Sequence, residues 1–395
     1  MEKTHLGYTK DRLTEFGAQF TAVEIEQQPE LWLKTYSQIL NSRPQIINFM
    51  ERLINSNNTD IIFTGAGTSA FIGNSLRGIF NKNNNNVTRA IATTDIVTHP
   101  HYFLNREKPT LLVSFARSGD SPESIAAVQL ADQLCKSLFH LIITCNADGK
   151  LAKSANKKNT MVIVLPPEAN DKGLAMTSSF TSMLLAGILI SKIKHLEALE
   201  NDIELLTNYG QKIITQYAED LRKTCELPFN RAVFLGSGPL LGCAEECHLK
   251  LQELTDGYVV SKFDSFLGFR HGPKAVINPS TLMSYFFSSD QYVYQYERDL
   301  LLAINEKEKS IFSIGVMEKD HEDIDVNLRI VLSANNNELI DPDLLPVVNT
   351  LIGQLTGFYK SLHLGLKPDN PSARGAITRV VQGVKIYPLM NNSRQ

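Results

Sequence analysis

The chain has 395 residues, of which 43% are hydrophobic and 21% charged, and its formal net charge is −3. This length is too great for one small core and predicts two domains of ordinary size. The small net charge gives no reason to expect a nucleic-acid or anionic-membrane partner. The longest apolar run, at 183–190, is too short to span a bilayer, and the N-terminus lacks the apolar core of a secretory signal. We therefore expect a cytoplasmic protein.

The first half of the chain predicts helices followed by a parallel sheet. Residues 1–55 have a polar, helical pattern around the single tryptophan, Trp32, which we expect to pack rather than to function. The stretch DIIFTGAGTSAFIGNSLRGIF then has the order strand, glycine turn, helix. A loop and short strand follow, then further strands at TLLVSF, LFHLIIT and MVIV, and a long helix at AMTSSFTSMLLAGILISKI. Strands alternating with helices at this spacing predict a doubly wound α/β domain.

The second half repeats this order. After a polar helical stretch at 195–224, strands are expected at RAVFLGSG, TLMSYFFSS, SIFSIGV and LRIVLS, and the last helix at LLPVVNTLIGQLTGFYKSLHLG. Both halves open alike, with Phe63-Thr64-Gly65-Ala66-Gly67 against Phe234-Leu235-Gly236-Ser237-Gly238. We expect two copies of one α/β domain. The predicted division is a helical segment at 1–45, a first domain at 46–210 and a second at 211–395.

Two loops of the first half could hold a phosphate. Thr68 and Ser69 follow the first glycine turn, and Ser118, Gly119 and Ser121 lie between a strand and a helix. Ligands of open α/β sheets bind at the carboxyl ends of the strands, where helix N-termini offer free N–H groups. Ser121 is equally a good N-cap, so each loop alone fits capping as well as binding. GAGTSA also fits the dinucleotide fingerprint, but the acidic residue required about 20 positions later is absent.

A candidate acid–base site lies in the second half, at 236–274. Glu246, Lys250 and Glu253 share one face of a predicted helix, and His271 follows in the loop Arg270-His271-Gly272-Pro273. Alone, such a face is usually a solvated row of ion pairs. The two loops suited to a phosphate change that reading, because the carboxylates then have a charged substrate to act on.

The five cysteines predict neither disulfides nor a metal site. Their odd, scattered set does not indicate a disulfide framework. Cys243 and Cys247, followed by His248, share a helical face, but a zinc site needs three or four ligands and no second cluster is visible. We expect structural cysteines and no metal.

These motifs resemble the sugar isomerase (SIS) family over nearly the whole chain. GAGTS and the serine-rich SGxS loop resemble its phosphosugar-binding motif, and AEECHLKLQELTDGY…GFRHGP resembles the isomerase half of glucosamine-6-phosphate synthase. QQPELW, SFARSGDSPES, AMTSSFT, DSFLGFRHGPK and RVVQGVKIYP are similar to bacterial enzymes of galactosamine catabolism. The resemblance implies two tandem, flavodoxin-like SIS domains of three layers, α/β/α, after an N-terminal helical segment.

The resemblance also implies roles for matching positions. Gly67, Thr68, Ser69, Ser118, Gly119 and Ser121 would hold the substrate phosphate, with Arg117 as a further contact. Glu253 would move a proton between C1 and C2, while Glu246 and Lys250 line the open-chain sugar. His271 would assist ring opening, and in relatives it comes from a neighbouring subunit, which implies a homodimer or homotetramer.

Three positions depart from the family pattern, the first being Ala116, where the family loop has serine. Arg117 stands where the family has an uncharged side chain, and could bind phosphate or pair with Asp120 or Glu123. Gln382 matches the lysine of the synthase tail, so either ring closure or the last polar contact to the sugar differs.

The implied reaction is conversion of galactosamine 6-phosphate and water to tagatose 6-phosphate and ammonia. It needs one tuned carboxylate and no cofactor. The chain reaches its first sugar-binding loop by residue 65, which leaves no room for a glutaminase domain, so we expect the breakdown direction. The alternatives are a tagatose-6-phosphate ketose/aldose isomerase without deamination, a glucosamine-6-phosphate deaminase and, more distantly, a non-catalytic phosphosugar sensor.

Overall fold

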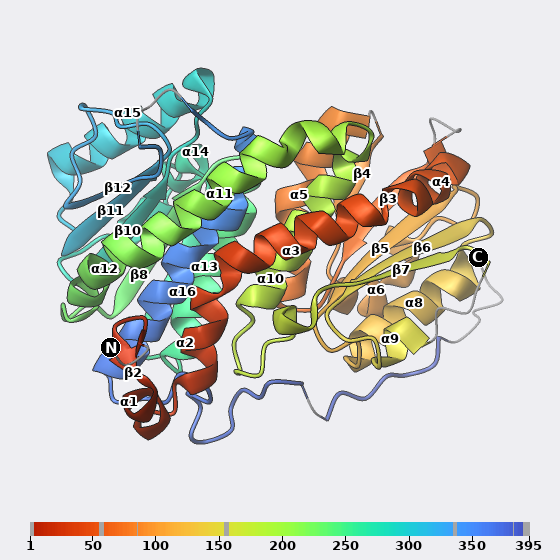
Figure 1. The fold of residues 1–395 in the computed structure, drawn as a ribbon, viewed down its shortest axis with the longest axis horizontal. Helices are drawn as coiled ribbons and strands as arrows, with labels where there is room; N and C mark the ends of the chain where they lie inside the picture. Colours follow the sequence, from red (N-terminus) through yellow and green to blue (C-terminus); the bar gives the residue numbers. More distant parts are fainter. Residues whose placement is uncertain are drawn as a thin grey trace.

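A computed structural model describes residues 4–54, 59–84, 86–153, 158–334, 338–381 and 383–389. These residues form two five-stranded parallel sheets, each flanked by helices, with long helices between them (Figure 1). A small antiparallel hairpin, β1 (Thr4–His5) and β2 (Tyr8–Thr9), precedes the first helix. None of the described helices is long and apolar enough to cross a membrane.

The first sheet has the strand order β4-β3-β5-β6-β7. Its strands are β3 (Asp60–Thr64), β4 (Thr88–Ala90), β5 (Thr110–Ala116), β6 (Leu138–Thr144) and β7 (Thr160–Val164). Side chains alternate between its faces: Phe63 and Val113 pack with α5 (Thr68–Asn84), whereas Ile62 and Leu112 pack with α8 (Pro122–Leu134). Because both faces are covered, the strands read as continuous apolar runs.

The second sheet has the strand order β12-β11-β10-β8-β9. Its strands are β8 (Arg231–Gly236), β9 (Val260–Asp264), β10 (Thr281–Phe286), β11 (Phe312–Met317) and β12 (Leu328–Val331). Numbered within each sheet, both orders are 2-1-3-4-5, the flavodoxin-like order. The expected pair of doubly wound, three-layer domains is confirmed, while the predicted division at residues 45 and 210 stays a prediction.

The remaining helices surround the sheets or connect them. The described residues place them as follows: α1 (Lys10–Glu15), α2 (Gln19–Glu26), α3 (Gln28–Asn41), α4 (Arg43–Ile54), α6 (Thr93–Thr98), α7 (Pro100–Phe103), α9 (Lys150–Lys153), α10 (Ser178–Ser191), α11 (Glu200–Lys212), α12 (Ala218–Cys225), α13 (Pro239–Leu254), α14 (Phe266–Phe269), α15 (Gln291–Lys307) and α16 (Leu345–His363). The expected N-terminal helical segment is present as α1–α4. A π-helical turn at Ile213–Tyr217 joins α11 to α12, and short 3-10 turns span Pro167–Ala169, Ile193–Leu199, Pro273–Val276 and Pro342–Leu344.

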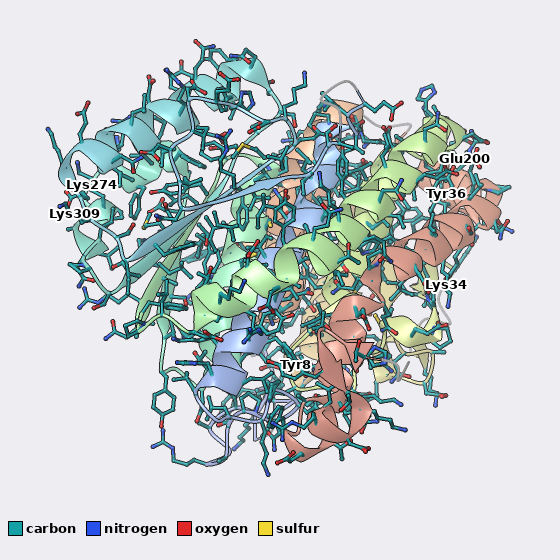
Figure 2. All side chains as sticks on the ribbon, turned by 60° about the vertical axis from the view of Figure 1, so that its left-hand side comes forward. Tyr8, Lys34, Tyr36, Glu200, Lys274 and Lys309 are labelled. Carbon is teal, nitrogen blue, oxygen red and sulfur yellow. The ribbon has the colours of Figure 1, made fainter. Side chains whose placement is uncertain are left out.

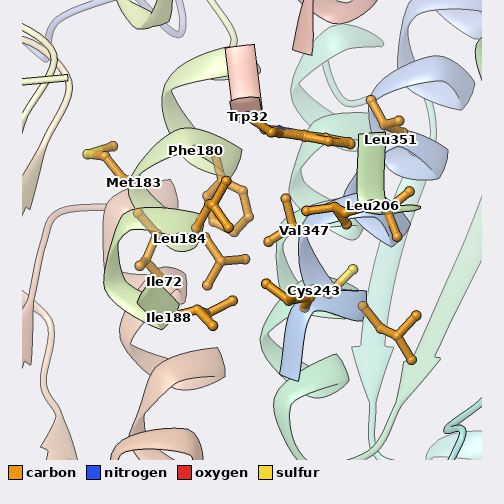
Figure 3. Close-up of a cluster of buried hydrophobic side chains, with 14 of the residues drawn as sticks. Trp32, Ile72, Phe180, Met183, Leu184, Ile188, Leu206, Cys243, Val347 and Leu351 are labelled. Atoms are coloured by element: carbon orange, nitrogen blue, oxygen red, sulfur yellow. The ribbon is translucent and has the colours of Figure 1, made fainter. Parts of the chain in front are cut away.

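One hydrophobic core joins the two halves. Trp32 of α3, Phe180 of α10, Leu206 of α11, Cys243 of α13 and Val347 of α16 belong to a single buried cluster (Figure 3). Trp32 is fully buried, and its indole N–H donates to the Thr181 hydroxyl at 3.1 Å, so its predicted packing role is confirmed. The shared core fixes the second domain's helices against the first domain, which places α13 beside the first sheet's loops.

The helices α13 and α16 approach closely. A Cβ on Gly353 of α16 would lie 2.4 Å from the Cα of Cys247, a distance that only glycine permits. Cys243 and Cys247 are both fully buried at this contact, with their sulfurs 4.0 Å apart. They pack against α16, in agreement with the structural role predicted for them.

Sequence patterns missed several short elements, among them a strand and a hairpin. Strand β9 is an edge strand of five residues, VSKFD, with an exposed first residue, so it lacks the apolar run that marked its neighbours. The strands β1 and β2, of two residues each, form a hairpin in a segment that we expected to be helical. Strand β9 is held by pairing with β8, and the two short strands of the hairpin pair with each other.

Candidate active site

A cavity of about 490 Å³ opens where the first sheet's loops meet α13. It is lined by Gly67, Thr68, Arg117, Leu174, Met176, Leu249, Lys250, Glu253, Gly375, Ala376, Ile377, Thr378, Arg379 and Val381. The cavity walls are therefore the loops after β3 and β5, the segment before α10 that holds Leu174 and Met176, one face of α13, and the C-terminal segment. This is the carboxyl edge of the first sheet, where ligands of such folds bind.

A buried ammonium group joins the two domains at this cavity. Lys250 and Glu246 are both fully buried, and Lys250 Nζ lies 3.2 Å from Glu246 Oε1. Nζ also donates to the Thr68 hydroxyl at 3.1 Å and forms an ion pair with Glu253. The three charged side chains predicted to share one helix face are therefore in contact with one another. Glu246 and Lys250 are buried rather than exposed to solvent.

Burial sets the protonation of this cluster. Burial raises the pKa of Glu246 to about 8, although the charge of Lys250 acts to lower it. Hydrogen bonding from Lys250 and Thr68 also acts to lower this pKa, but burial outweighs it. Burial alone would lower the pKa of Lys250, but Glu246 and Glu253 outweigh it and raise that pKa. Lys250 is therefore a fixed cation near neutral pH, and Glu246 is a carboxyl group that can gain a proton there.

We expect Glu246→Gln to change how stability depends on pH. With a pKa of about 8 when folded against 4.5 for the free side chain, Glu246 makes the folded state bind more protons than the unfolded state between those values. Folding stability then falls as pH rises through that window. The variant lacks this loss, so its melting temperature relative to wild type should rise steadily between about pH 5 and pH 8.

Differential scanning fluorimetry across that pH range measures the difference. Glu322→Gln, at an exposed carboxylate, is the matched control and should leave the slope unchanged. A pH-independent difference for Glu246→Gln would contradict the raised pKa.

The glycine turn before α5 presents Thr68 and Ser69 at a helix N-terminus. Gly67 has φ +55°, a left-handed conformation that glycine adopts without strain, and a Cβ on Gly65 would strike the Ser69 backbone. Thr68 lines the cavity, whereas the Ser69 hydroxyl lies 3.8 Å from the Met176 sulfur. The backbone at this turn therefore requires both glycines.

The second loop leaves a serine hydroxyl available. Ser121 occupies the N-cap position of α8 but makes no side-chain capping hydrogen bond. Gly119 has φ +72°, and the Ser118 hydroxyl accepts from the Asp120 N–H at 3.3 Å. Of the two readings left open by the sequence, capping is wrong for the Ser121 side chain.

The equivalent loop of the second sheet is already occupied by carboxylates. Asp290 caps α15, accepting from Tyr292 N–H at 2.8 Å and Val293 N–H at 3.3 Å. Glu297, fully buried, accepts from Ser288 N–H at 2.7 Å, and Glu318 accepts from the Ser289 hydroxyl. In this loop the donors that could face a phosphate are satisfied internally, whereas the Ser121 hydroxyl of the first sheet's loop makes no capping bond.

Comparison with known proteins agrees with this arrangement. The family model of the SIS domain matches residues 53–193. Over 393 residues the chain is 40% identical to the D-galactosamine-6-phosphate deaminase AgaS of Shewanella sp. (strain ANA-3), covering 98% of this chain and 97% of that protein. The chain belongs to the SIS family.

Solved structures support the same assignment. A Clostridium novyi NT crystal structure superposes with a TM-score of 0.95 at 41% identity, covering 98% of this chain and 100% of that one. The tagatose-6-phosphate ketose/aldose isomerase from Escherichia coli superposes with a TM-score of 0.85 at 35% identity, covering 93% and 96%. Relatives of this SIS chain therefore carry both of the names suggested by its motifs.

Not every predicted residue lines the cavity of this SIS protein. Gly67, Thr68, Arg117, Lys250 and Glu253 do, whereas Ser69, Ser118, Gly119, Ser121, Glu246 and His271 do not. His271 is exposed, and Lys274, three residues later, lies at the outer edge of the second domain in Figure 2. Gln382 falls outside the described residues.

Arg117 has partners that sequence reasoning did not foresee. It is 7% exposed, and its Nη1 donates to the Leu174 carbonyl at 3.1 Å, while Nη2 donates to the Arg379 carbonyl at 2.5 Å. The suggested ion pair with Asp120 or Glu123 is wrong: Asp120 instead accepts from Lys150 N–H at 3.1 Å. Arg117 remains next to the cavity, so its predicted contact with phosphate stays a prediction.

The C-terminal wall of the SIS cavity was also missed. Residues 375–379 and Val381 line it, yet the sequence marked only Gln382 in this segment. Apart from Arg379, these residues carry small or apolar side chains in an irregular stretch, so no periodicity singles them out. The motif RVVQGVKIYP, which includes Arg379, was the available signal.

Proposed function

We propose that this chain converts D-galactosamine 6-phosphate and water to D-tagatose 6-phosphate and ammonia. The observation that carries the proposal is the contact of the Glu246–Lys250–Glu253 row with Thr68, because it joins a proton-transfer face to an anion-binding turn in one cavity. The relative from Shewanella sp. is named for this deaminase activity. The proposed setting is the cytoplasm.

The substrate phosphate would lie at the N-termini of α5 and α8. Thr68, Ser69, Ser118 and Ser121 would donate hydroxyl hydrogen bonds there, and Gly67 and Gly119 would let backbone N–H groups approach. Arg117 would add positive charge beside the cavity. In this arrangement the phosphate would lie on the first domain, and the sugar would extend toward α13.

Glu253 would then carry the proton. Its carboxylate removes the C2 proton of the open-chain aldose, the C2–H electron pair forms the C1–C2 double bond, and the carbonyl oxygen takes a proton from water, giving an enolamine. The same carboxyl returns the proton to C1, and the nitrogen lone pair forms the C2=N bond of a ketimine. Water adds at C2 and ammonia leaves, which yields the ketose.

Lys250 and Glu246 would support this transfer. The fixed charge of Lys250 stabilises negative charge that develops on the substrate oxygen, and its ion pair with Glu253 orients the carboxylate. His271 would assist ring opening in a neighbouring subunit of a homodimer or homotetramer. Its exposure on its own chain is consistent with that role.

A ketose/aldose isomerase acting on tagatose 6-phosphate is the second candidate, since the Escherichia coli relative carries that name. One experiment separates the two. Ammonia and ketose release are measured with galactosamine, glucosamine and N-acetylgalactosamine 6-phosphates, alongside aldose formation from tagatose 6-phosphate. We expect stoichiometric ammonia and ketose from galactosamine 6-phosphate; ketose–aldose exchange without ammonia would replace the proposal with the alternative.

We expect Ser121→Ala to impair substrate binding without destabilising α8. Because its hydroxyl makes no capping bond, the melting temperature should change little, while loss of a hydrogen bond to a charged group should raise KM by about tenfold. The matched control is Asp290→Ala, which removes a true cap in the other sheet and should cost about 1 kcal/mol of stability with KM unchanged. A stability loss without a KM effect at Ser121 would restore the capping reading.

A further inference from the structure

The C-terminal segment is attached to the body of the protein at two points. We call residues 366–381 the strap; Figure 1 shows this part of the chain leaving α16 and crossing to the first domain. At its first end the Asp369 carboxylate accepts from Thr21 N–H at 2.7 Å and Phe20 N–H at 3.1 Å, at the start of α2. The Asp369 N–H also donates to the Gly17 carbonyl at 2.9 Å.

The second attachment is formed by Arg379 and Arg117. Arg379 Nε donates to the Asp171 carbonyl at 3.0 Å, and Nη2 donates to the Asn170 side chain at 3.2 Å. In return, the Arg379 carbonyl accepts from Arg117 Nη2. Between the two attachments, residues 375–378 line the same cavity as Lys250 and Glu253.

The buried side chain of Arg117 forms hydrogen bonds with backbone carbonyl groups. Its terminal nitrogens donate to carbonyls of two separate segments, 173–174 and Arg379, and among the described residues no carboxylate forms an ion pair with it. A charged group this far from water is retained where its hydrogen bonds are needed. A planar guanidinium reaches several carbonyls at once, which a lysine ammonium at the same place cannot.

We propose that Arg117 is a positioning residue that fixes the strap as a wall of the substrate cavity. It acts through the Arg379 carbonyl, and the Arg379 side chain completes the attachment. The effect on catalysis rests on the proposed function, whereas the effect on the strap does not. Loss of the attachment leaves the phosphate loops and Glu253 in place but loosens the wall that confines the sugar.

The experiment compares full-length wild type with Arg117→Lys, Arg379→Ala and the double variant. Hydrogen exchange of peptides from residues 366–381 is measured without substrate, and KM and kcat are measured with galactosamine 6-phosphate. We expect each single variant to speed exchange of the strap by about tenfold, the equivalent of one lost hydrogen bond. KM should rise more than kcat falls, and the double variant should add little to either single one.

Arg374→Lys, at an exposed position of the strap with no part in the attachments, is the matched control and should match wild type. If Arg117→Lys does not fold, Arg379→Ala, which removes an exposed side chain and leaves Arg117 in place, tests the same attachment. Unchanged strap exchange in a folded variant overturns the proposal, and so does a raised KM with normal exchange, which would make Arg117 a direct phosphate ligand. Faster strap exchange in an enzyme inactive on every sugar phosphate supports the attachment and overturns only the proposed function.

Discussion

Glu253→Gln should abolish turnover while leaving substrate binding intact. The amide keeps the size and position of the carboxylate but cannot accept and return a proton, so we expect kcat to fall by about a thousandfold or more. Thr68 and Lys250 remain in place, because Glu246 still pairs with Lys250. Galactosamine 6-phosphate should therefore still raise the melting temperature of the variant.

Ammonia release and ligand-induced thermal shift measure the two properties separately. The matched control is Glu245→Gln, a neighbouring carboxylate on α13 that contacts Asn74 at 2.6 Å and does not line the cavity. It should retain turnover. Normal turnover in Glu253→Gln would remove the proposed proton carrier and the mechanism with it.

We expect Asp171→Ala to lower the free energy of unfolding more than any other substitution named above. Asp171 is fully buried at the N-terminus of α10, where it accepts from the N–H groups of Thr177, Ser178 and Ser179 at 2.9–3.0 Å and from two hydroxyls. Its removal leaves five buried donors without their acceptor at a positive helix terminus. We expect a loss of about 3–5 kcal/mol, because breaking a buried charged network costs that much.

Urea denaturation of the wild type and variants measures this loss. Asp171→Asn, which keeps one carbonyl acceptor, should lose less, and Asp148→Ala, at an exposed ion pair with Lys153, should change stability by less than about 1 kcal/mol. Equal stability of Asp171→Ala and wild type would show that ordered water replaces the carboxylate. The same carboxylate explains the motif AMTSSFT, whose hydroxyl residues surround it.

Much of the fold was predictable because its signals are local. The apolar runs of β3, β5, β6 and β8 and the glycine turns after β3 and β8 show the alternation of strands and helices without any tertiary contact. Spacing alone also placed Glu246, Lys250 and Glu253 on one helix face, since a helix fixes that geometry. Strand β9 was not predicted because an edge strand is stabilised by pairing with its neighbour rather than by a pattern in its own sequence.

The type of each domain can be predicted from sequence alone, and so can the two glycine turns and the row of charged residues on α13, since each follows from the backbone geometry of a short segment. The tertiary structure decided that this row lies on Thr68, 182 residues away, and that Lys250 is buried there rather than solvated. It also decided that Arg117 holds the strap and that carboxylates fill the second sheet's loop. These contacts depend on which distant surfaces the shared core brings together. Burial then sets the protonation state of the ionisable side chains in them.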